Sequence, residues 1–220
     1  MDTNMTKRDI LKKYLLFLIG LFISSFGVSF ITKAELGTSP ISSIPYVLSL
    51  GFPLTLGNFT IIFNIMLVLL QILILGKDFK KTDLLQVIVA FLFGYFIDWT
   101  MLLLDWLHPV FYLTKVFFLF IGCLILALGV YFEVYANVIM LPGESFVRAV
   151  TLRWNTDFGN TKVCFDATMT IIAATISLIL FHSLKGVREG TVIAALVVGI
   201  IAKMYGRLFQ KIAERLISSI

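Results

Sequence analysis

Apolar residues cluster along the chain in six runs, each about 20 residues long and bounded by charged or turn-forming residues. A helix of that length crosses the roughly 30 Å hydrocarbon core of a bilayer. We therefore predict six transmembrane helices. The six runs are Tyr14 to Ile31, Phe59 to Leu75, Leu84 to Leu104, Val116 to Val134, Val163 to Leu180 and Thr191 to Phe209.

Two further apolar segments, Ile41 to Phe52 and Phe146 to Trp154, are too short to cross. The longer of the two would span only about 18 Å as a helix. Each follows a proline, Pro40 or Pro142, at a position where proline favours the first helical turn. Irregular backbone at membrane depth survives only inside protein or beside a wet cavity, so we predict two re-entrant half-helices.

The sequence also repeats itself. A shift of 102 positions places 19–74 on 121–176 with 14 identities in 56 positions, and a shift of 105 then brings Gly94 onto Gly199. We predict an all-α polytopic membrane protein with one membrane domain over residues 1–220, repeat one at about 14–105 and repeat two at about 112–211. Three crossings and one half-helix in each repeat would invert the second repeat relative to the first and place the function between them.

Composition and charge agree with this architecture. Hydrophobic residues make up 59% of the chain, charged residues 14%, and the mean hydropathy is +0.98, which excludes an ordinary soluble domain. We attribute the net charge of +5 to the positive-inside rule and not to a nucleic-acid partner. Inverted repeats with both termini cytoplasmic put 14 Lys and Arg residues inside and 4 outside, against 12 and 6 if both short helices cross. The inverted topology is favoured.

The sequence offers little for catalysis or metal binding. His108 and His182 lie at the ends of apolar runs, and Cys123 and Cys164 lie inside them. No Cys, His and carboxylate residues have the spacing of a metal site, and no Ser and His are placed for nucleophilic catalysis. We expect free thiols, no metal, no cofactor and no enzymatic activity.

Ionisable residues inside apolar runs are costly and therefore mark candidate sites. Asp166 is the sharpest candidate, because it lies one helical turn after Lys162 and is matched in the first repeat by the polar residue Asn64. Two interpretations remain open: an intramembrane polar site, and a purely structural pair between Lys162 and Asp166.

The amino ends of the half-helices are the second candidate, since free backbone N–H groups there suit an anionic group. Glu144 follows Pro142 and Gly143, and Thr38 and Ser39 hold the corresponding place in the first repeat. Capping of its own helix by Glu144 is the alternative. The predicted substrate-binding set is Thr38, Ser39, Asn64, Glu144, Ser145, Lys162, Asp166, Glu189 and Thr191.

Asp98 and Lys203 occupy matched repeat positions with opposite charge, and we interpret them as a structural ion pair. The predicted structural or coupling set is Asp98, Lys203, Gly37, Pro40, Pro142 and Gly143.

These motifs resemble the YczE/YyaS/YitT family of bacterial integral membrane proteins over nearly the whole chain. The resemblance rests on Leu36-Gly37-Thr38-Ser39-Pro40, Thr55-Leu56-Gly57, Pro142-Gly143-Glu144, Lys162, Asp166 and, most specifically, Val187-Arg188-Glu189-Gly190-Thr191. It implies a multi-pass protein of the bacterial cell membrane and brings no settled activity with it.

We expect a small transporter or channel-like protein for a small polar solute, with its site between the repeats near the bilayer midplane. Two alternatives remain open: a substrate-capturing membrane subunit of a larger transport complex, and a non-transporting accessory protein that assembles or localises other membrane proteins. The expected partners are the lipid bilayer, the solute, and either further copies of the chain or other membrane subunits.

Overall fold

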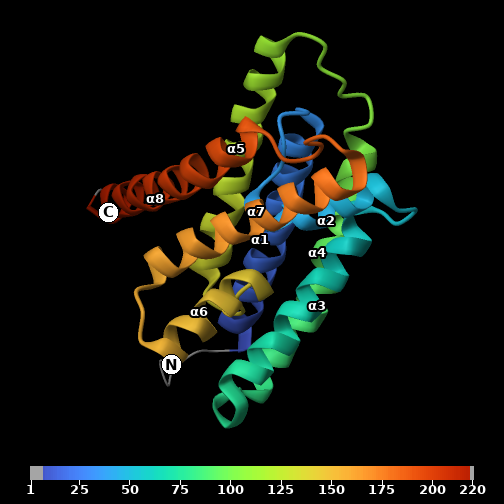
Figure 1. Ribbon diagram of the computed structural model, residues 1–220. Helices are drawn as coiled ribbons and strands as arrows, with labels where there is room; N and C mark the ends of the chain where they lie inside the picture. The colour runs from blue at the N-terminus through green and yellow to red at the C-terminus, as the bar shows by residue number, and fades with distance from the viewer. Residues whose placement is uncertain (1–6, 219–220) are drawn as a thin grey trace.

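A computed structural model describes residues 7–218, and every regular element in that range is helical (Figure 1). The helices are α1 (Lys7–Lys33), α2 (Pro40–Gly51), α3 (Leu56–Leu75), α4 (Leu85–Leu103), α5 (Tyr112–Ala136), α6 (Pro142–Trp154), α7 (Phe158–Phe181) and α8 (Glu189–Ser218), with 3₁₀ turns at Gly76–Asp78 and Lys81–Leu84. Six of them are long and apolar enough to cross a membrane, which confirms the six predicted spans. Residues 1–6 and 219–220 lie outside the described part, as do the side chains of Lys7, Lys211 and Arg215 from the charge count.

The short helices α2 and α6 begin where the sequence predicts. Pro40 and Pro142 are their first residues, because a proline ring already fixes the helical φ and its missing N–H would have no partner there. Helix α6 ends at Trp154, and the next residue, Asn155, takes the left-handed conformation with φ 51° that often follows a helix. At 12 and 13 residues, both helices are shorter than a membrane crossing requires.

Helices α1 and α5 pack side by side (Figure 1). A side chain at Gly27 would collide with Leu126, and a side chain at Gly129 would collide with the backbone of Ser24. Glycine therefore lets the two backbones approach closely, as small residues do between membrane helices. Further along, Ile31 lies against Gly122, so residue numbers rise on α1 as they fall on α5. The two helices are antiparallel.

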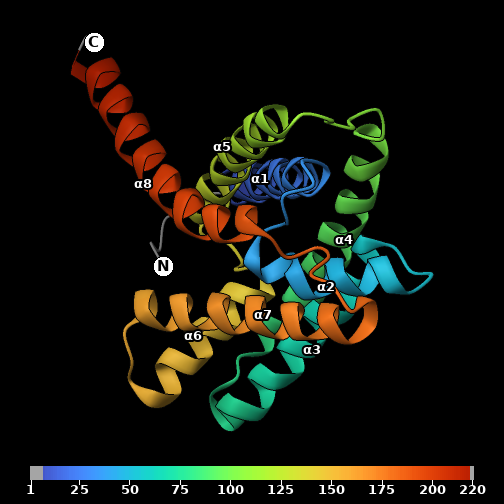
Figure 2. The ribbon, with the colours of Figure 1, turned by 45° about the horizontal axis from the view of Figure 1, so that its top comes forward.

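Each short helix packs on a long helix from the other half of the chain: α2 on α7 and α6 on α3 (Figure 2). The Ser43 hydroxyl donates to the carbonyl oxygen of Met169 at 3.3 Å, and the Gln71 amide donates to the carbonyl oxygen of Pro142 at 3.1 Å. The amino ends of the short helices meet, because Ile41 fills the space beside Gly143. The centre of the fold is therefore built from both halves.

Helix α4 packs tightly against α3, and this contact corrects one prediction. The Asp98 carboxylate accepts from the Gly57 N–H at 2.7 Å and from the Thr55 hydroxyl at 2.6 Å, so it caps the amino end of α3. Lys203 lies exposed on α8, and no ion pair joins it to Asp98 in the described residues. The predicted Asp98–Lys203 pair is wrong, because a helix end offered the carboxylate closer donors.

Candidate functional site

A cavity of about 390 Å³ lies between the carboxyl ends of α3 and α5, the amino end of α4, and α6. Exposed residues of the loop between α3 and α4, including Asp78 and Lys80, line one end of it. The polar residues deeper in the fold that line it are Gln71, Gln86, Glu133, Glu144 and Ser145. A cavity of this size suits a small molecule, and its polar groups come from both halves of the chain.

Glu133 is the most buried carboxylate along this cavity. It lies near the end of α5, is only 6% exposed, and accepts a hydrogen bond of 2.5 Å from the Ser24 hydroxyl of α1. Burying a carboxylate is costly unless it is paired or hydrogen-bonded, and one hydroxyl satisfies only part of its capacity. Glu144 on α6 lines the same cavity, so the two carboxylates belong to one site. Their proximity favours a ligand that brings hydrogen-bond donors or positive charge.

Three further residues that line the cavity form a hydrogen-bonded network of amide and hydroxyl groups. The buried side chain of Gln71 donates to the Gln86 side-chain oxygen at 3.2 Å, and Gln86 donates to the Ser145 hydroxyl at 3.0 Å. Because Gln71 also reaches the Pro142 carbonyl, helices α3 and α4 are both fastened to the first turn of α6. This network positions Glu144, which follows Pro142 by two residues.

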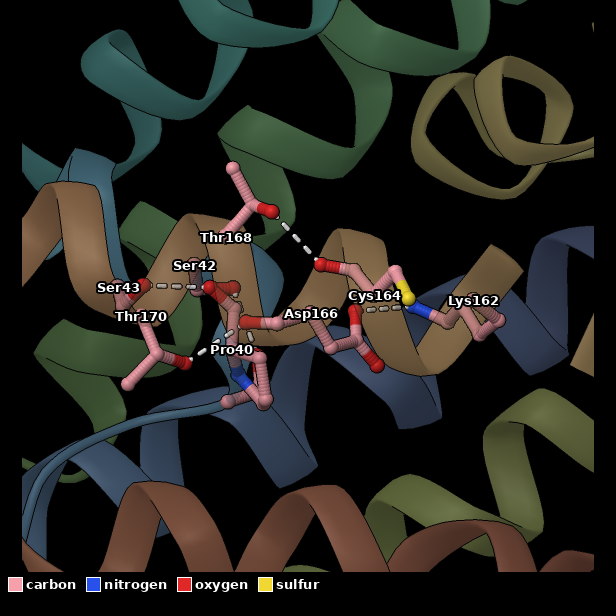
Figure 3. Close-up of polar contacts among 9 residues, drawn as sticks. Pro40, Ser42, Ser43, Lys162, Cys164, Asp166, Thr168 and Thr170 are labelled. Carbon is pink, nitrogen blue, oxygen red and sulfur yellow. Dashed lines mark hydrogen bonds and ion pairs between the residues drawn. The ribbon is translucent and has the colours of Figure 1, made fainter. Parts of the chain in front are cut away.

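Lys162 and Asp166 lie on α7, outside the residues that line this cavity. They form an ion pair of 2.6 Å along the helix, and Figure 3 shows the pair beside the first turn of α2 with Pro40, Ser42 and Ser43. The side chains are 29% and 17% exposed. The geometry agrees with the structural interpretation of the pair and leaves its role in a site as a prediction.

The amino end of α2 is covered by other residues, whereas the amino end of α6 lines the cavity. The Thr38 N–H donates to the Thr191 hydroxyl at 3.2 Å, and the Gly190 N–H donates to the Leu36 carbonyl at 2.8 Å. Gly37, with φ +113°, lets Thr191 approach this closely. Thr38, Thr191 and Ser39 are all at most 5% exposed. The first turn of α8 therefore covers the start of α2.

The other candidate residues lie elsewhere. Asn64 is buried within α3, whereas Glu189 is exposed and pairs with Arg188 at 3.1 Å. The sequence-predicted set thus divides into four groups: Glu144 and Ser145 at the cavity, Thr38, Ser39 and Thr191 at the closed end, Lys162 and Asp166 on α7, and Asn64 and Glu189 apart from all of these.

A second cavity of about 310 Å³ lies at the opposite end of α1, beside the start of α3 and the end of α4. Lys33 is among its lining residues and donates to Asp105 at 2.8 Å, which lowers the pKa of that exposed carboxyl. Lys115 of α5 pairs with Glu35 on the same side. The cations at this end are therefore matched by acids.

Sequence analysis missed Glu133, Gln71 and Gln86. Glu133 had a usable signal, because it is the only charged residue in the apolar run from Val116 to Val134. The two glutamines are polar residues within other spans, and only the packing of α3, α4 and α6 brings them together.

The chain belongs to the family described as a family of unknown function (DUF6198), whose model matches residues 11–207. It is similar to the "Uncharacterized protein YyaS" of Bacillus subtilis (strain 168), with 24% identity over 204 residues that cover 92% of this chain and 94% of the relative. No solved structure matches the chain. The match agrees with the family resemblance noted from the motifs.

Proposed function

We propose that the protein is a small membrane transporter whose solute site is the cavity between Glu133, Glu144 and the Gln71–Gln86–Ser145 network. The observation that carries this proposal is a difference between the surroundings of α6 and those of α2, which hold matched positions in the two repeats. The 390 Å³ cavity reaches the carboxylates of Glu133 and Glu144 beside α6, while the matched place beside α2 is covered by the first turn of α8. An open place and a closed copy of it are what alternating access between two repeats requires.

The proposed arrangement is a pair of inverted repeats with re-entrant α2 and α6. Three features support it: the antiparallel crossing of α1 and α5, the exchanged packing of α2 and α6, and the meeting of their amino ends. In this topology both termini are cytoplasmic, in a bacterial cell membrane, and the loop with Lys77, Lys80 and Lys81 is also inside. The cavity would then face the cytoplasm.

The four cations that this topology places outside all contact other groups of the fold. Lys33 and Lys115 pair with Asp105 and Glu35. Arg188 bonds to Glu189 and to the Glu35 carbonyl, and Lys185 lies 5.1 Å from the centre of the Phe181 ring. The positive-inside rule counts Lys and Arg and gives little weight to acidic partners, so these four are outvoted by the 14 placed inside.

The proposed solute is small and polar and presents hydrogen-bond donors or a positive group to Glu133 and Glu144. A hydrogen bond to a charged group contributes about 1.5–3 kcal/mol, so two such contacts would dominate its recognition. The proposal assigns no reaction to the protein and requires no cofactor.

A thermal-unfolding screen of the detergent-purified protein against a panel of small metabolites tests this function. A ligand present at 100 times its Kd stabilises the folded protein by about 2.7 kcal/mol. We expect a hit to raise the unfolding midpoint of the wild type and of Glu189→Gln, whose carboxylate lies outside the cavity, but not of Glu144→Gln. The hit should then enter proteoliposomes that contain wild-type protein. Binding that survives Glu144→Gln, or binding without uptake, would contradict the proposal.

A further inference from the structure

Helices α3 and α4 form a tight antiparallel pair, whereas their repeat mates α7 and α8 diverge from the loop that joins them (Figure 2). In the first pair, a side chain at Gly57 would collide with the Gly94 carbonyl, so two glycines form the crossing. Their mates are Gly159 and Gly199. A side chain at Gly199 would meet nothing within 4 Å, and one at Gly159 would meet only the Asp157 carboxylate at 3.1 Å. The second half therefore has the same pair of glycines, but no other helix packs against either of them in the described residues.

The polar contact beside the crossing is also matched, with complementary charges. Thr55 caps α3 by accepting from the Asn58 N–H, and Asp157 caps α7 by accepting from the Asn160 N–H. Thr55 donates to Asp98 of α4 at 2.6 Å, and the repeat mate of Asp98 is Lys203. The hydroxyl of Thr55 and the carboxylate of Asp98 in the first half thus correspond to the carboxylate of Asp157 and the ammonium of Lys203 in the second. Both Asp157 and Lys203 are exposed.

The chain's own α8 is held away from α7 at both ends. The Gly190 N–H donates to the Leu36 carbonyl at 2.8 Å, and the Phe209 ring stacks on Tyr131 of α5 with centroids 5.1 Å apart. The α7 surface is therefore available to a helix from another molecule.

We propose that α7 is an interface for a second copy of this chain, whose α8 packs on it as α4 packs on α3. Gly199 of the second copy crosses Gly159, and Lys203 of the second copy pairs with Asp157. Small residues at a membrane helix crossing permit this close approach, and reciprocal exchange between two copies gives a closed two-fold dimer. The inference uses the repeat alignment and does not depend on the solute.

Crosslinking between differently tagged chains tests the interface in membranes. In a Cys123→Ala, Cys164→Ser background, one chain carries Asp157→Cys and the other carries Lys203→Cys, so a disulfide between the tags forms only between molecules. We expect this disulfide on mild oxidation, and none when Phe117→Cys, exposed on α5, replaces Asp157→Cys. Absence of the intermolecular link overturns the proposal. So does a disulfide that forms only within a chain carrying both cysteines, because α8 would then close on its own α7.

Gly199→Leu provides a second test that spares the fold. Since nothing lies within 4 Å of this position in one chain, the larger side chain should leave the unfolding midpoint of the monomer unchanged. We expect it to reduce the crosslinked dimer at least tenfold. Asp157→Lys and Lys203→Asp should each weaken the uncrosslinked dimer, and the two together should restore it. A dimer that tolerates Gly199→Leu would refute the interface.

Discussion

Helices α2 and α6 hold matched places in the two halves of the molecule, yet they carry different chemistry. Both begin at a proline, and both carry a serine that is hydrogen-bonded to the opposite half of the chain. Ser43 donates to the Met169 carbonyl, and Ser145 accepts from the Gln86 side chain. Helix α2 has no charged residue and is covered by α8, whereas α6 carries Glu144 and lines the cavity. The shared residues fix the positions of the two short helices. In the proposed transporter, the residues that differ between the halves form the solute site.

The largest expected effect concerns the glycines at the start of α3 and α7. Gly57→Ala should lower the free energy of unfolding by about 2–3 kcal/mol, because its Cβ would overlap the Gly94 carbonyl and the Asp98 carboxylate. Gly159→Ala should change it by less than about 1 kcal/mol, since it meets only Asp157. Thermal unfolding of the detergent-solubilised monomer measures both. Equal destabilisation would show that the two halves pack alike.

The next effect concerns Glu133 and its repeat mate Ile31, both buried against the α1–α5 crossing. Glu133→Ile places at this position of the second half the residue that the first half has at the matched position. We expect it to keep the fold, because apolar groups often replace buried charges at little cost, and to weaken ligand binding about 10–100-fold. Titration of a screened ligand by thermal shift measures this loss. Unchanged affinity would remove Glu133 from the site.

A smaller effect separates the matched positions Asp98 and Lys203. Asp98→Asn should cost about 1–2 kcal/mol of stability, because the amide is a weaker acceptor for the Gly57 N–H and the Thr55 hydroxyl. Lys203→Gln should leave monomer stability unchanged, because the side chain is exposed. If both variants unfold at the wild-type temperature, Asp98 is not a structural cap.

The smallest effect is expected at Asp166. Loss of its half-buried pair with Lys162 in Asp166→Asn should cost about 0.5 kcal/mol, because partly exposed pairs along a helix contribute little. Ligand affinity should stay within about twofold of the wild type, since Asp166 does not line the cavity. A large loss of affinity would extend the site to α7 and restore the intramembrane interpretation made from sequence.

Local features of the sequence predict the framework better than the site. Run length and the prolines at 40 and 142 locate the six spans and both short helices, because each depends on neighbouring residues alone. Glu133 could have been found as a lone charge in an apolar run. The contacts of Gln71 with Gln86 could not, because they need three helices in place. Asp98 and Lys203 were paired wrongly, because equal repeat positions do not imply spatial proximity.

The inverted arrangement of the repeats is the central claim, and labelling of single cysteines on intact cells tests it most directly. Lys80→Cys and Lys185→Cys would be placed separately in the background without Cys123 and Cys164 and treated with an impermeant thiol reagent. Lys80 lies in the loop after α3, and Lys185 lies in the matched loop after α7. The account predicts labelling at position 185 and none at position 80. Labelling at both positions would mean parallel repeats and would contradict an alternating site between α2 and α6.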